Sequence, residues 1–236
     1  MKAIVSIPTY NEAENIETLV YQILDLPVDI GVIVVDDNSP DGTGKIVDRL
    51  HTAFPDRVYH LHRENRAGFA AAHKAGLRYA LKNTNAEYIL TMDADFSHDP
   101  KYIPKMLTKM EEYDVIIGSR YIKNGGTQNW DIGRKLLSRG ANIYARTILS
   151  LSAGDCTGGF RCFRRKVVEH IDIEHLYSHG YGYLIETLFK CQRNGYKIGE
   201  IPIIFVDRQF GKSKLSKAIA VEAFFLVLKL RIRGEK

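Results

Sequence analysis

Short runs of apolar, mostly β-branched residues recur in the first half of this 236-residue chain and alternate with longer amphipathic segments. The apolar runs are AIVSI, GVIVV, VYHL, YILTM and DVIIG. They do not alternate with polar residues, which is typical of strands buried on both faces of a parallel sheet. Between them, apolar residues follow helical spacing, as do Ile16, Leu19, Val20, Ile23 and Leu24. The pattern predicts an α/β fold, a doubly wound, mostly parallel sheet with helices on both faces.

After Tyr121 the alternation becomes less regular. The polar, glycine-rich stretch IKNGGTQNWDIGR predicts a mobile loop. The next segments predict a helix in KLLSRGANIYARTILSLSAGD, a short strand in TGGFRCF, a helix in GYLIETLFKCQRNG and a strand in KIGEIPIIFVDR. A basic loop, RQFGKSKLS, and a closing helix, KAIAVEAFFLVLKLRIR, follow. Because no clean boundary interrupts the chain, we expect a single domain over residues 1–236.

The composition narrows the class of protein. Apolar residues make up 45% of the chain and charged residues 26%, ordinary values for a globular protein with a substantial core. A net charge of +5 favours an anionic partner but does not choose among a nucleotide, a phospholipid head group and nucleic acid. Basic and aromatic residues do not interleave in a stripe, so we expect no binding to nucleic acid.

Signals for targeting and for disulfide bonds are weak. No apolar stretch reaches the roughly 18 residues of a membrane-spanning helix, and the N-terminus lacks the pattern of a signal peptide. We therefore expect that the chain does not cross a membrane by itself. The cysteines, Cys156, Cys162 and Cys191, form no C-x-x-C pair, which disfavours a disulfide framework or zinc site and favours a reducing compartment.

Polar clusters follow three of the predicted strands. PTYNE follows the first strand, DDNSPDG the second and DAD the fourth. In open α/β sheets, ligands bind at the carboxyl ends of strands, near the point where the strand order reverses. We therefore expect these clusters to meet at one site, although they lie far apart in the sequence.

The DAD cluster predicts a metal site. Residues two apart on an extended chain point to the same side, so Asp93 and Asp95 would share a hard cation such as Mg²⁺ or Mn²⁺. A solvated acidic turn is the alternative, and the place of the pair at the end of an apolar strand favours the metal. A calcium-binding EF-hand is excluded, because His98 stands where that loop needs glycine and Pro104 where it needs glutamate.

Asp37 ends the second predicted strand, where an acidic side chain would accept hydrogen bonds from a base or a ribose hydroxyl. Its neighbours are also good turn residues, so a plain turn is an equal alternative. The GKS triplet in FGKSK is not a phosphate-binding P-loop, because Val206 stands where that motif needs glycine.

Basic residues near the expected site would neutralise phosphate. Arg120, Arg208 and Lys214 follow predicted strands, where we expect them to hold phosphate oxygens. Arg134, beside the glycine-rich loop, is a further candidate. The other basic residues of these segments are interpreted as a solvated surface: Lys135, Arg139 and Lys212.

Seven motifs in order, covering nearly the whole chain, resemble the inverting family 2 glycosyltransferases of GT-A fold. They are IPTYNE, VVDDNSPDGT, NRAGFAAAHKAG, MDADFSHDP, GSRY, CTGGFRCF and FVDRQFGKSKL. Within that family, the chain is most similar to enzymes that move mannose from GDP-mannose to dolichyl or another polyprenyl phosphate, with a β-linked product. The resemblance implies a nucleotide-sugar-binding half at about residues 1–120 and an acceptor- and lipid-facing half at about 121–236.

The same resemblance implies roles for individual residues. It implies contacts with the donor or the acceptor at these positions: Pro8, Tyr10, Glu12, Val35, Asp37, Asp93, Ala94, Asp95, Arg120, Arg134, Arg208 and Lys214. It implies catalytic roles for Asp93, Asp95 and Arg120, and an Mg²⁺ or Mn²⁺ cofactor bound directly by Asp95, with Asp93 beside it. Ser97 stands where some relatives have a glutamine ligand. Serine is shorter, so a water would intervene, and the preferred metal stays open.

A lipid phosphate acceptor would make a general base unnecessary. A monophosphate ester has a second pKa near ~6 and is largely dianionic at neutral pH. A hydroxyl acceptor would instead need a side chain to remove its proton. We therefore expect catalysis by positioning and charge neutralisation alone.

The lipid acceptor also implies contact with a membrane surface. We expect a peripheral protein on the cytoplasmic side, held by its last predicted helix or by a membrane-anchoring partner protein. That helix combines apolar residues with a basic end, which suits an interfacial helix. A core helix packed on the sheet is an equal alternative, and KLLSRGANIYARTIL is a second candidate membrane surface.

Two other functions stay open at the level of sequence, and a third is disfavoured. A polyprenyl-phosphate glucosyltransferase that uses UDP-glucose would share most of the motifs. A non-catalytic nucleotide-sugar-binding module would bind the donor without turnover. A metal-dependent phosphohydrolase would need a nucleophilic aspartate at the first strand, where Pro8 and Thr9 stand.

Overall fold

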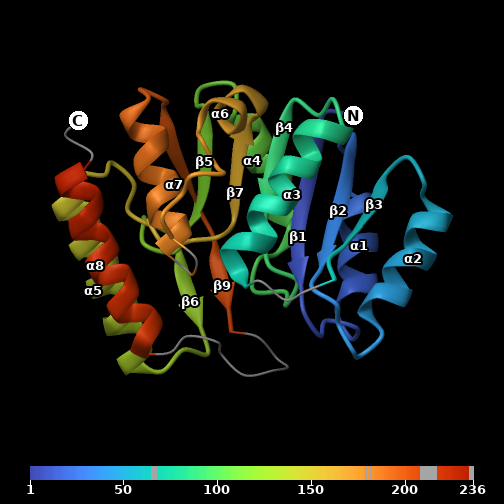
Figure 1. Ribbon diagram of the computed structural model, residues 1–236, viewed down its shortest axis with the longest axis horizontal. Helices are drawn as coiled ribbons and strands as arrows, with labels where there is room; N and C mark the ends of the chain where they lie inside the picture. Colours follow the sequence, from blue (N-terminus) through green and yellow to red (C-terminus); the bar gives the residue numbers. More distant parts are fainter. Residues whose placement is uncertain (65–67, 179, 181, 208–216, 234–236) are drawn as a thin grey trace.

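A central sheet of seven strands, in the order β3-β2-β1-β4-β7-β5-β8, organises the computed structural model (Figure 1). The structure describes residues 1–64, 68–178, 180, 182–207 and 217–233, with the backbone alone for 217–221 and 233. The strands of the central sheet are β1 (Ala3–Thr9), β2 (Ile30–Asp36), β3 (Val58–His62), β4 (Tyr88–Thr91), β5 (Val115–Ser119), β7 (Arg161–Arg164) and β8 (Ile198–Pro202). A second, two-stranded sheet pairs β6 (Gly126–Gln128) with β9 (Ile204–Val206).

Helices cover both faces of the central sheet (Figure 1). Their bounds are α1 (Ile16–Leu24), α2 (Thr43–Ala53), α3 (Phe69–Asn83), the 3₁₀ turn η1 (Pro100–Tyr102), α4 (Ile103–Lys109), α5 (Ile132–Leu149), α6 (Arg165–His170), α7 (Gly182–Arg193) and α8 (Lys217–Arg233). Buried side chains of α1, α2 and α4 pack on one face, and those of α3, α6 and α7 on the other. The predicted doubly wound α/β fold is confirmed.

The first five predicted strands are β1 to β5 of the structure. The apolar runs of β1, β2, β4 and β5 are buried on both sides, whereas β3 is an edge strand and is only partly buried. The chain departs from a parallel sheet at β7, which lies antiparallel between β4 and β5. The sequence predicted this strand but not its place. An apolar run carries no information about strand direction, which is set by the connection that precedes it.

Two segments of the second half differ from the prediction. IKNGGTQNWDIGR, predicted as a mobile loop, contains β6 and the start of α5. KIGEIPIIFVDR, predicted as one strand, is divided into β8, which extends the central sheet, and β9, which pairs with β6. The hydrogen bonds of β6 come from a partner 78 residues later in the chain, as the register Gly126↔Ile204 shows, so local polarity hides them. A side chain at Gly125 would meet the backbone oxygen of Ser119 at 2.5 Å, which explains a glycine there.

A third layer of helices flanks the sheet. α5 and α8 lie side by side at one end of the molecule (Figure 1). Leu226, Val227 and Leu230 of α8 are buried against α5 and α7, in a core cluster of their own. Among the described residues, every helix is too short or too polar to span a bilayer.

Candidate functional site

The strand order reverses between β1 and β4. From β1 the sheet continues to β2 and β3 on one side, and β4 pairs with β1 on the other. These strands run parallel, so the loops that follow Thr9 and Thr91 leave the same edge of the sheet. PTYNE, DDNSPDG and DAD lie at the ends of β1, β2 and β4 and in the loops that follow, as the sequence predicted. Ligands of open α/β folds bind at such a reversal point.

The loops after β1 and β2 brace each other. The backbone N–H of Asn11 donates to Ser39 Oγ at 3.0 Å, and that of Glu12 donates to Thr43 Oγ1 at 3.0 Å. Thr43 in turn donates to Asp41 at 2.6 Å. Ser39 and Asp41 of the turn after β2, together with Thr43 at the start of α2, therefore fix the loop that carries Tyr10 and Glu12.

The predicted nucleotide contacts differ in how accessible they are. Pro8 near the end of β1 is partly exposed, and so are Tyr10 and Glu12 in the loop that follows. Val35 is fully buried, and its side chain packs against α3 at Gly76. A contact between Val35 and a nucleotide would therefore have to come from the backbone.

Asp37 is buried and already has a cationic partner. Arg63 Nη1 forms an ion pair with Asp37 Oδ1, and the backbone N–H of Asp37 donates to the carbonyl of Thr9 at 3.1 Å. Sequence reasoning missed Arg63, which lies just after β3. Any hydroxyl of a ligand that bound Asp37 would share this carboxylate with the arginine.

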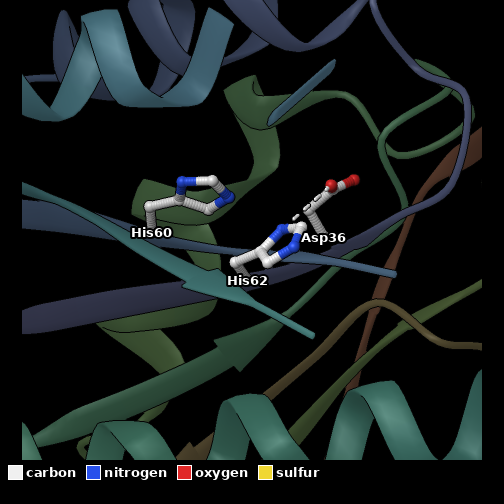
Figure 2. A group of neighbouring side chains, drawn as sticks. All are labelled: Asp36, His60 and His62. Atoms are coloured by element: carbon white, nitrogen blue, oxygen red, sulfur yellow. Dashed lines mark ion pairs between the residues drawn. The ribbon is translucent and has the colours of Figure 1, made fainter. Parts of the chain in front are cut away.

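Asp36 ends β2 and was not singled out by the sequence analysis. Its buried carboxylate accepts hydrogen bonds from Thr9 Oγ1 at 3.2 Å and Ser39 Oγ at 2.5 Å. On β3, His60 and His62 lie on the same face as Asp36, and His62 is its partner in the register (Figure 2). The period-two alternation of β2 would have turned attention to Asp36, because it follows the core residues Val32 and Val34 on one face.

The DAD loop holds its carboxylates in one turn. The Asp93 side chain is 33% exposed, whereas Asp95 is buried at 8%. Ser97 Oγ donates to Asp95 Oδ1 at 2.6 Å, and the Ser97 N–H donates to the same oxygen at 3.1 Å. Phe96 between them adopts a left-handed φ of 60°. Ser97 is thus within contact distance of Asp95, and its main visible effect is to orient that carboxylate.

His98 is buried beside the DAD loop and holds it in place through a hydrogen bond and ring packing. Its ring is buried, stacks on Phe160 at 5.1 Å and meets the edge of Phe205 at 5.5 Å. The backbone N–H of Asp93 donates to His98 Nδ1 at 3.0 Å, so Nδ1 carries no proton and the ring is neutral. Burial lowers the pKa of His98 and keeps it neutral. The histidine therefore positions Asp93.

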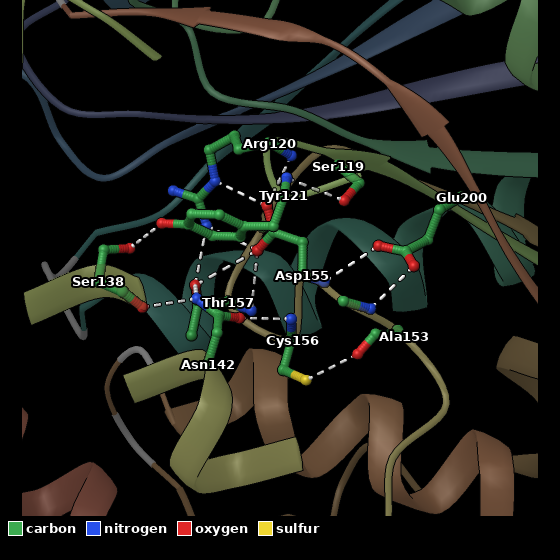
Figure 3. Close-up of polar contacts among 12 residues, drawn as sticks. Ser119, Arg120, Tyr121, Ser138, Asn142, Ala153, Asp155, Cys156, Thr157 and Glu200 are labelled. Atoms are coloured by element: carbon green, nitrogen blue, oxygen red, sulfur yellow. Dashed lines mark hydrogen bonds and ion pairs between the residues drawn. The ribbon is translucent and has the colours of Figure 1, made fainter. Parts of the chain in front are cut away.

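Arg120 is buried in a bidentate ion pair with Asp155. Arg120 Nε and Nη2 donate to the two carboxylate oxygens of Asp155 at 2.7 Å each, and Nη2 also donates to Thr157 Oγ1 at 2.8 Å (Figure 3). The loop of Asp155 is itself fixed by Glu200, which accepts the Asp155 N–H at 3.0 Å, and by Asn142, which accepts the Cys156 N–H at 2.7 Å.

The charges of this pair depend on each other. Burial alone would lower the pKa of Arg120 and raise the pKa of Asp155, because it disfavours both charged forms. Their mutual attraction outweighs burial, so the pKa of Arg120 is raised and that of Asp155 is lowered. Asp93 also raises the pKa of Arg120, which places this guanidinium within the electrostatic reach of the DAD loop. Sequence reasoning missed Asp155, although it directly precedes the CTGGF motif.

The ring of Trp130 lies close to the guanidinium groups of both Arg120 and Arg134. The Trp130 ring lies 5.6 Å from the Arg120 guanidinium and 4.1 Å from that of Arg134. Arg134 Nη1 also pairs with Asp207 Oδ2 at 2.7 Å. Trp130 is buried and stands in the stretch that the sequence predicted as a mobile loop.

The structure thus brings several predicted residues to one edge of the sheet. Asp93, Ala94, Asp95 and Ser97 share one loop, and Arg120 lies within its electrostatic reach. The predicted phosphate ligands Arg208 and Lys214 lie outside the described residues.

Residues 4–172 match the model of glycosyl transferase family 2. The chain belongs to this family. A polyprenol monophosphomannose synthase of Mycolicibacterium smegmatis is 40% identical over 234 residues, which cover 99% of this chain and 88% of that protein. An undecaprenyl-phosphate mannosyltransferase of Micrococcus luteus is 38% identical, over 94% of this chain and 91% of that protein.

Solved structures of related transferases share the fold, and the predicted GT-A fold is confirmed. Glucosyl-3-phosphoglycerate synthase of Mycobacterium tuberculosis, with Mn²⁺, UDP-glucose and phosphoglyceric acid, aligns with a TM-score of 0.69 and 19% identity over 98% of this chain and 79% of that one. A mannosyltransferase of Pyrobaculum calidifontis, with GDP-Man and Mn²⁺, aligns with a TM-score of 0.58 and 18% identity over 99% of this chain and 73% of that one. At these sequence identities the comparison shows a shared fold and does not identify the nucleotide that this chain binds.

Proposed function

We propose that this family 2 member is an inverting mannosyltransferase that moves mannose from GDP-mannose to dolichyl or another polyprenyl phosphate, giving a β-mannosyl phosphate lipid. The observation that carries the proposal is the similarity, over nearly the full chain, to two proteins named for polyprenol-linked mannose transfer. The arrangement of carboxylates and arginines at the reversal point of the sheet supports a transfer that displaces a nucleotide diphosphate.

The DAD loop fits a hard divalent metal. Asp93 and Asp95 supply carboxylate oxygens and Ser97 a hydroxyl oxygen, the donor types that Mg²⁺ and Mn²⁺ prefer. Ser97 orients the Asp95 carboxylate before any ligand arrives, and His98 fixes the backbone of Asp93. When bound, such an ion would neutralise the diphosphate of the leaving nucleotide.

Arg120 would supply fixed positive charge near the reacting phosphates. Its salt bridge with Asp155 aligns the guanidinium without flexible rearrangement, which favours electrostatic stabilisation of a developing anion. Arg134 would add charge from the start of α5. In this proposal the acceptor phosphate attacks as a dianion, so no side chain removes a proton and catalysis rests on alignment.

A membrane surface would be met by α5 and α8. Both helices expose large apolar side chains at helical spacing: Ile132, Leu136 and Ile143 on α5, and Phe224, Phe225, Leu228 and Ile232 on α8. We call these side chains the α5–α8 apolar face. Exposed cations accompany it, at Lys135, Arg139, Lys229 and Arg231. Apolar side chains with cations between them suit a layer of anionic lipid.

A transfer assay tests the proposal directly. Purified chain is incubated with radiolabelled GDP-mannose, dolichyl phosphate in detergent and Mg²⁺ or Mn²⁺, and label is followed into the organic phase. We expect transfer that EDTA abolishes and that Asp95→Ala lowers by about 100-fold or more. Asp99→Ala is the matched control, because Asp99 lies in the same loop but caps η1.

The outcomes separate the candidate functions. Transfer from UDP-glucose and not from GDP-mannose would replace the mannosyl assignment with a glucosyl one. Binding of GDP-mannose without transfer from either donor would support a non-catalytic binding module. Equal loss of activity in Asp99→Ala and Asp95→Ala would contradict the role of Asp95.

A further inference from the structure

Three side chains at the ends of β2 and β3 form a ligand set that the proposed transfer does not use. Asp36, His60 and His62 each offer one ligand atom, and these atoms lie within 4.8 Å of one another (Figure 2). The strand register places the two histidines two residues apart on the face of the sheet that also carries Asp36. Two imidazoles and a carboxylate are ligands that transition metals prefer.

A hydrogen bond at Nδ1 of His60 orients the ring so that its other nitrogen, Nε2, can bind a metal. Its Nδ1 lies 2.7 Å from Asp48 Oδ1. A carboxylate accepts, so the proton of this hydrogen bond belongs to Nδ1, and Nε2 is the ring nitrogen left to bind a metal. The side chain is only 10% exposed, and Nε2 has no hydrogen-bond partner among the residues that the structure describes. Metal-binding histidines usually make this kind of second hydrogen bond to a carboxylate.

Nε2 of His60 therefore needs an explanation, because buried nitrogens are rarely left unpaired. Figure 2 shows the His60 ring turning one nitrogen toward Asp36 and His62. A bound cation would satisfy it.

The other two ligands complement His60. Asp36 is 1% exposed, and Thr9 and Ser39 fix its carboxylate by hydrogen bonds. The Nδ1 of His62 lies 3.8 Å from Asp36 Oδ2. The His62 side chain is 53% exposed, so a metal ion and water could reach the cluster from this side. Gly44, in the first turn of α2, lies over the cluster, and a side chain there would meet Asp36 Oδ2 at 3.3 Å.

The geometry and charge suit a divalent ion. Metal–ligand bonds of about 2.0–2.2 Å separate the ligand atoms of a tetrahedral site by roughly 3.3–3.6 Å, so small side-chain rotations would close this set. The N-terminus of α2 carries about half a positive elementary charge, which disfavours a nearby cation. The negative charges of the Asp36 and Asp48 carboxylates are larger than this positive charge.

We infer that Asp36, His60 and His62 bind a divalent transition metal, of which Zn²⁺ is the representative, with water in the fourth position. This site is separate from the DAD loop, because two to three strand spacings, roughly 10–14 Å, lie between them. Binding would join the ends of β2 and β3 and restrain the loop that carries Asp37. The inference does not depend on the transferase activity.

Metal uptake by the purified, EDTA-treated chain tests the site. Zn²⁺ binding is measured by calorimetry, and Co²⁺ binding by its visible absorption, both without nucleotide and in the Asp95→Ala background. We expect about one equivalent of metal and a rise in melting temperature at a free Zn²⁺ concentration about 100 times the Kd. His62→Ala, at an exposed position, is expected to fold and to lose at least about tenfold in affinity.

Further variants make the test specific. Asp48→Asn leaves all three ligands in place and removes only the support of His60, so affinity is expected to fall about 10–100-fold. His175→Gln is the control, because His175 is 84% exposed and contacts a carboxylate, Asp172, without a second histidine. Unchanged affinity in His62→Ala, or the absence of Zn²⁺ uptake by the parent chain, would overturn the site.

Discussion

At the scale of single residues, the Arg120–Asp155 pair allows a sharp prediction. Both side chains are buried and share two hydrogen bonds, so removal of Asp155 leaves an uncompensated buried charge. Breaking a buried pair in this way costs about 3–5 kcal/mol. We expect Asp155→Ala to lower the free energy of unfolding by that amount, as measured by denaturant titration.

The chain supplies a matched control for this prediction. Arg78 and Glu174 form the same bidentate geometry, at 2.6 Å for both bonds, but their side chains are 56% and 50% exposed. Solvent screens such a pair, and its contribution is about 0–1 kcal/mol. Glu174→Ala should therefore change stability little. A similar loss in both variants would show that burial does not set the energy of the Arg120 pair.

Some residues of the candidate site can be recognised from the sequence, and others cannot. Asp93 and Asp95 stand out because two carboxylates follow an apolar strand, which local spacing reveals. Asp155 and Arg63 do not stand out, because neither belongs to a local pattern that marks a ligand-binding residue. Their significance comes from partners 35 and 26 positions away, which only the folded chain brings into contact.

At the scale of elements, the sequence predicted the strands and helices that are marked by buried apolar residues. It missed the short strands that form only because they pair with each other. The apolar runs of β1 to β5 and the apolar closing helix α8 can be recognised from local composition. β6 and β9 are three residues each and are stabilised by each other, so neither carries a pattern that marks it as a strand. The site depends on this small sheet, because β9 supplies Phe205 beside His98 and Trp130.

The closing helix α8 packs on the core along one side and exposes large apolar side chains along the other. Val227 and Leu230 are buried in the core, while Phe225 and Ile232 are 63% and 74% exposed. A truncation of α8 would open that core, so point substitutions on the α5–α8 apolar face are the better test of membrane contact.

We expect Phe225→Ser with Ile232→Ser to weaken binding to anionic lipid vesicles by at least about tenfold. A fully buried side chain of this size contributes about 1.5–3 kcal/mol, and 1.4 kcal/mol is a factor of ten. Stability should change little, since both side chains face solvent. Tyr21→Ser is the control, because Tyr21 is 48% exposed on α1. Sedimentation with vesicles measures the effect, and unchanged binding of the double variant would contradict a role for this face.

At the scale of the whole molecule, buried histidines link stability to pH. His73 is fully buried between Phe69 and Tyr183, and neither ring nitrogen has a hydrogen-bond partner among the described residues. Burial lowers the pKa of His73 to about 3, against 6.5 for an exposed histidine. His98 is shifted in the same direction, also chiefly by burial.

The sign of the effect follows from where protons bind. Between pH 6.5 and about 3 the unfolded chain protonates His73 and the folded chain does not, so stability is complete above pH 6.5 and falls as the pH decreases. One such group contributes a slope of at most about 1.4 kcal/mol per pH unit. Asp155, whose pKa is lowered from 3.8, acts in the same direction but only at more acidic pH, so the range from 6.5 to 4.5 belongs to the histidines.

We therefore expect the free energy of unfolding to decline from pH 6.5 to 4.5, and His73→Leu to remove a large part of that decline. Leucine has a similar volume and no nitrogen to protonate or leave unpaired, so the variant should also be no less stable at pH 7. Denaturant titrations at several pH values measure the slope. His175→Gln should keep the parent slope, because His175 is 84% exposed when folded. A slope that His73→Leu leaves unchanged would mean that His73 is protonated in the folded chain or that other groups set its acid sensitivity.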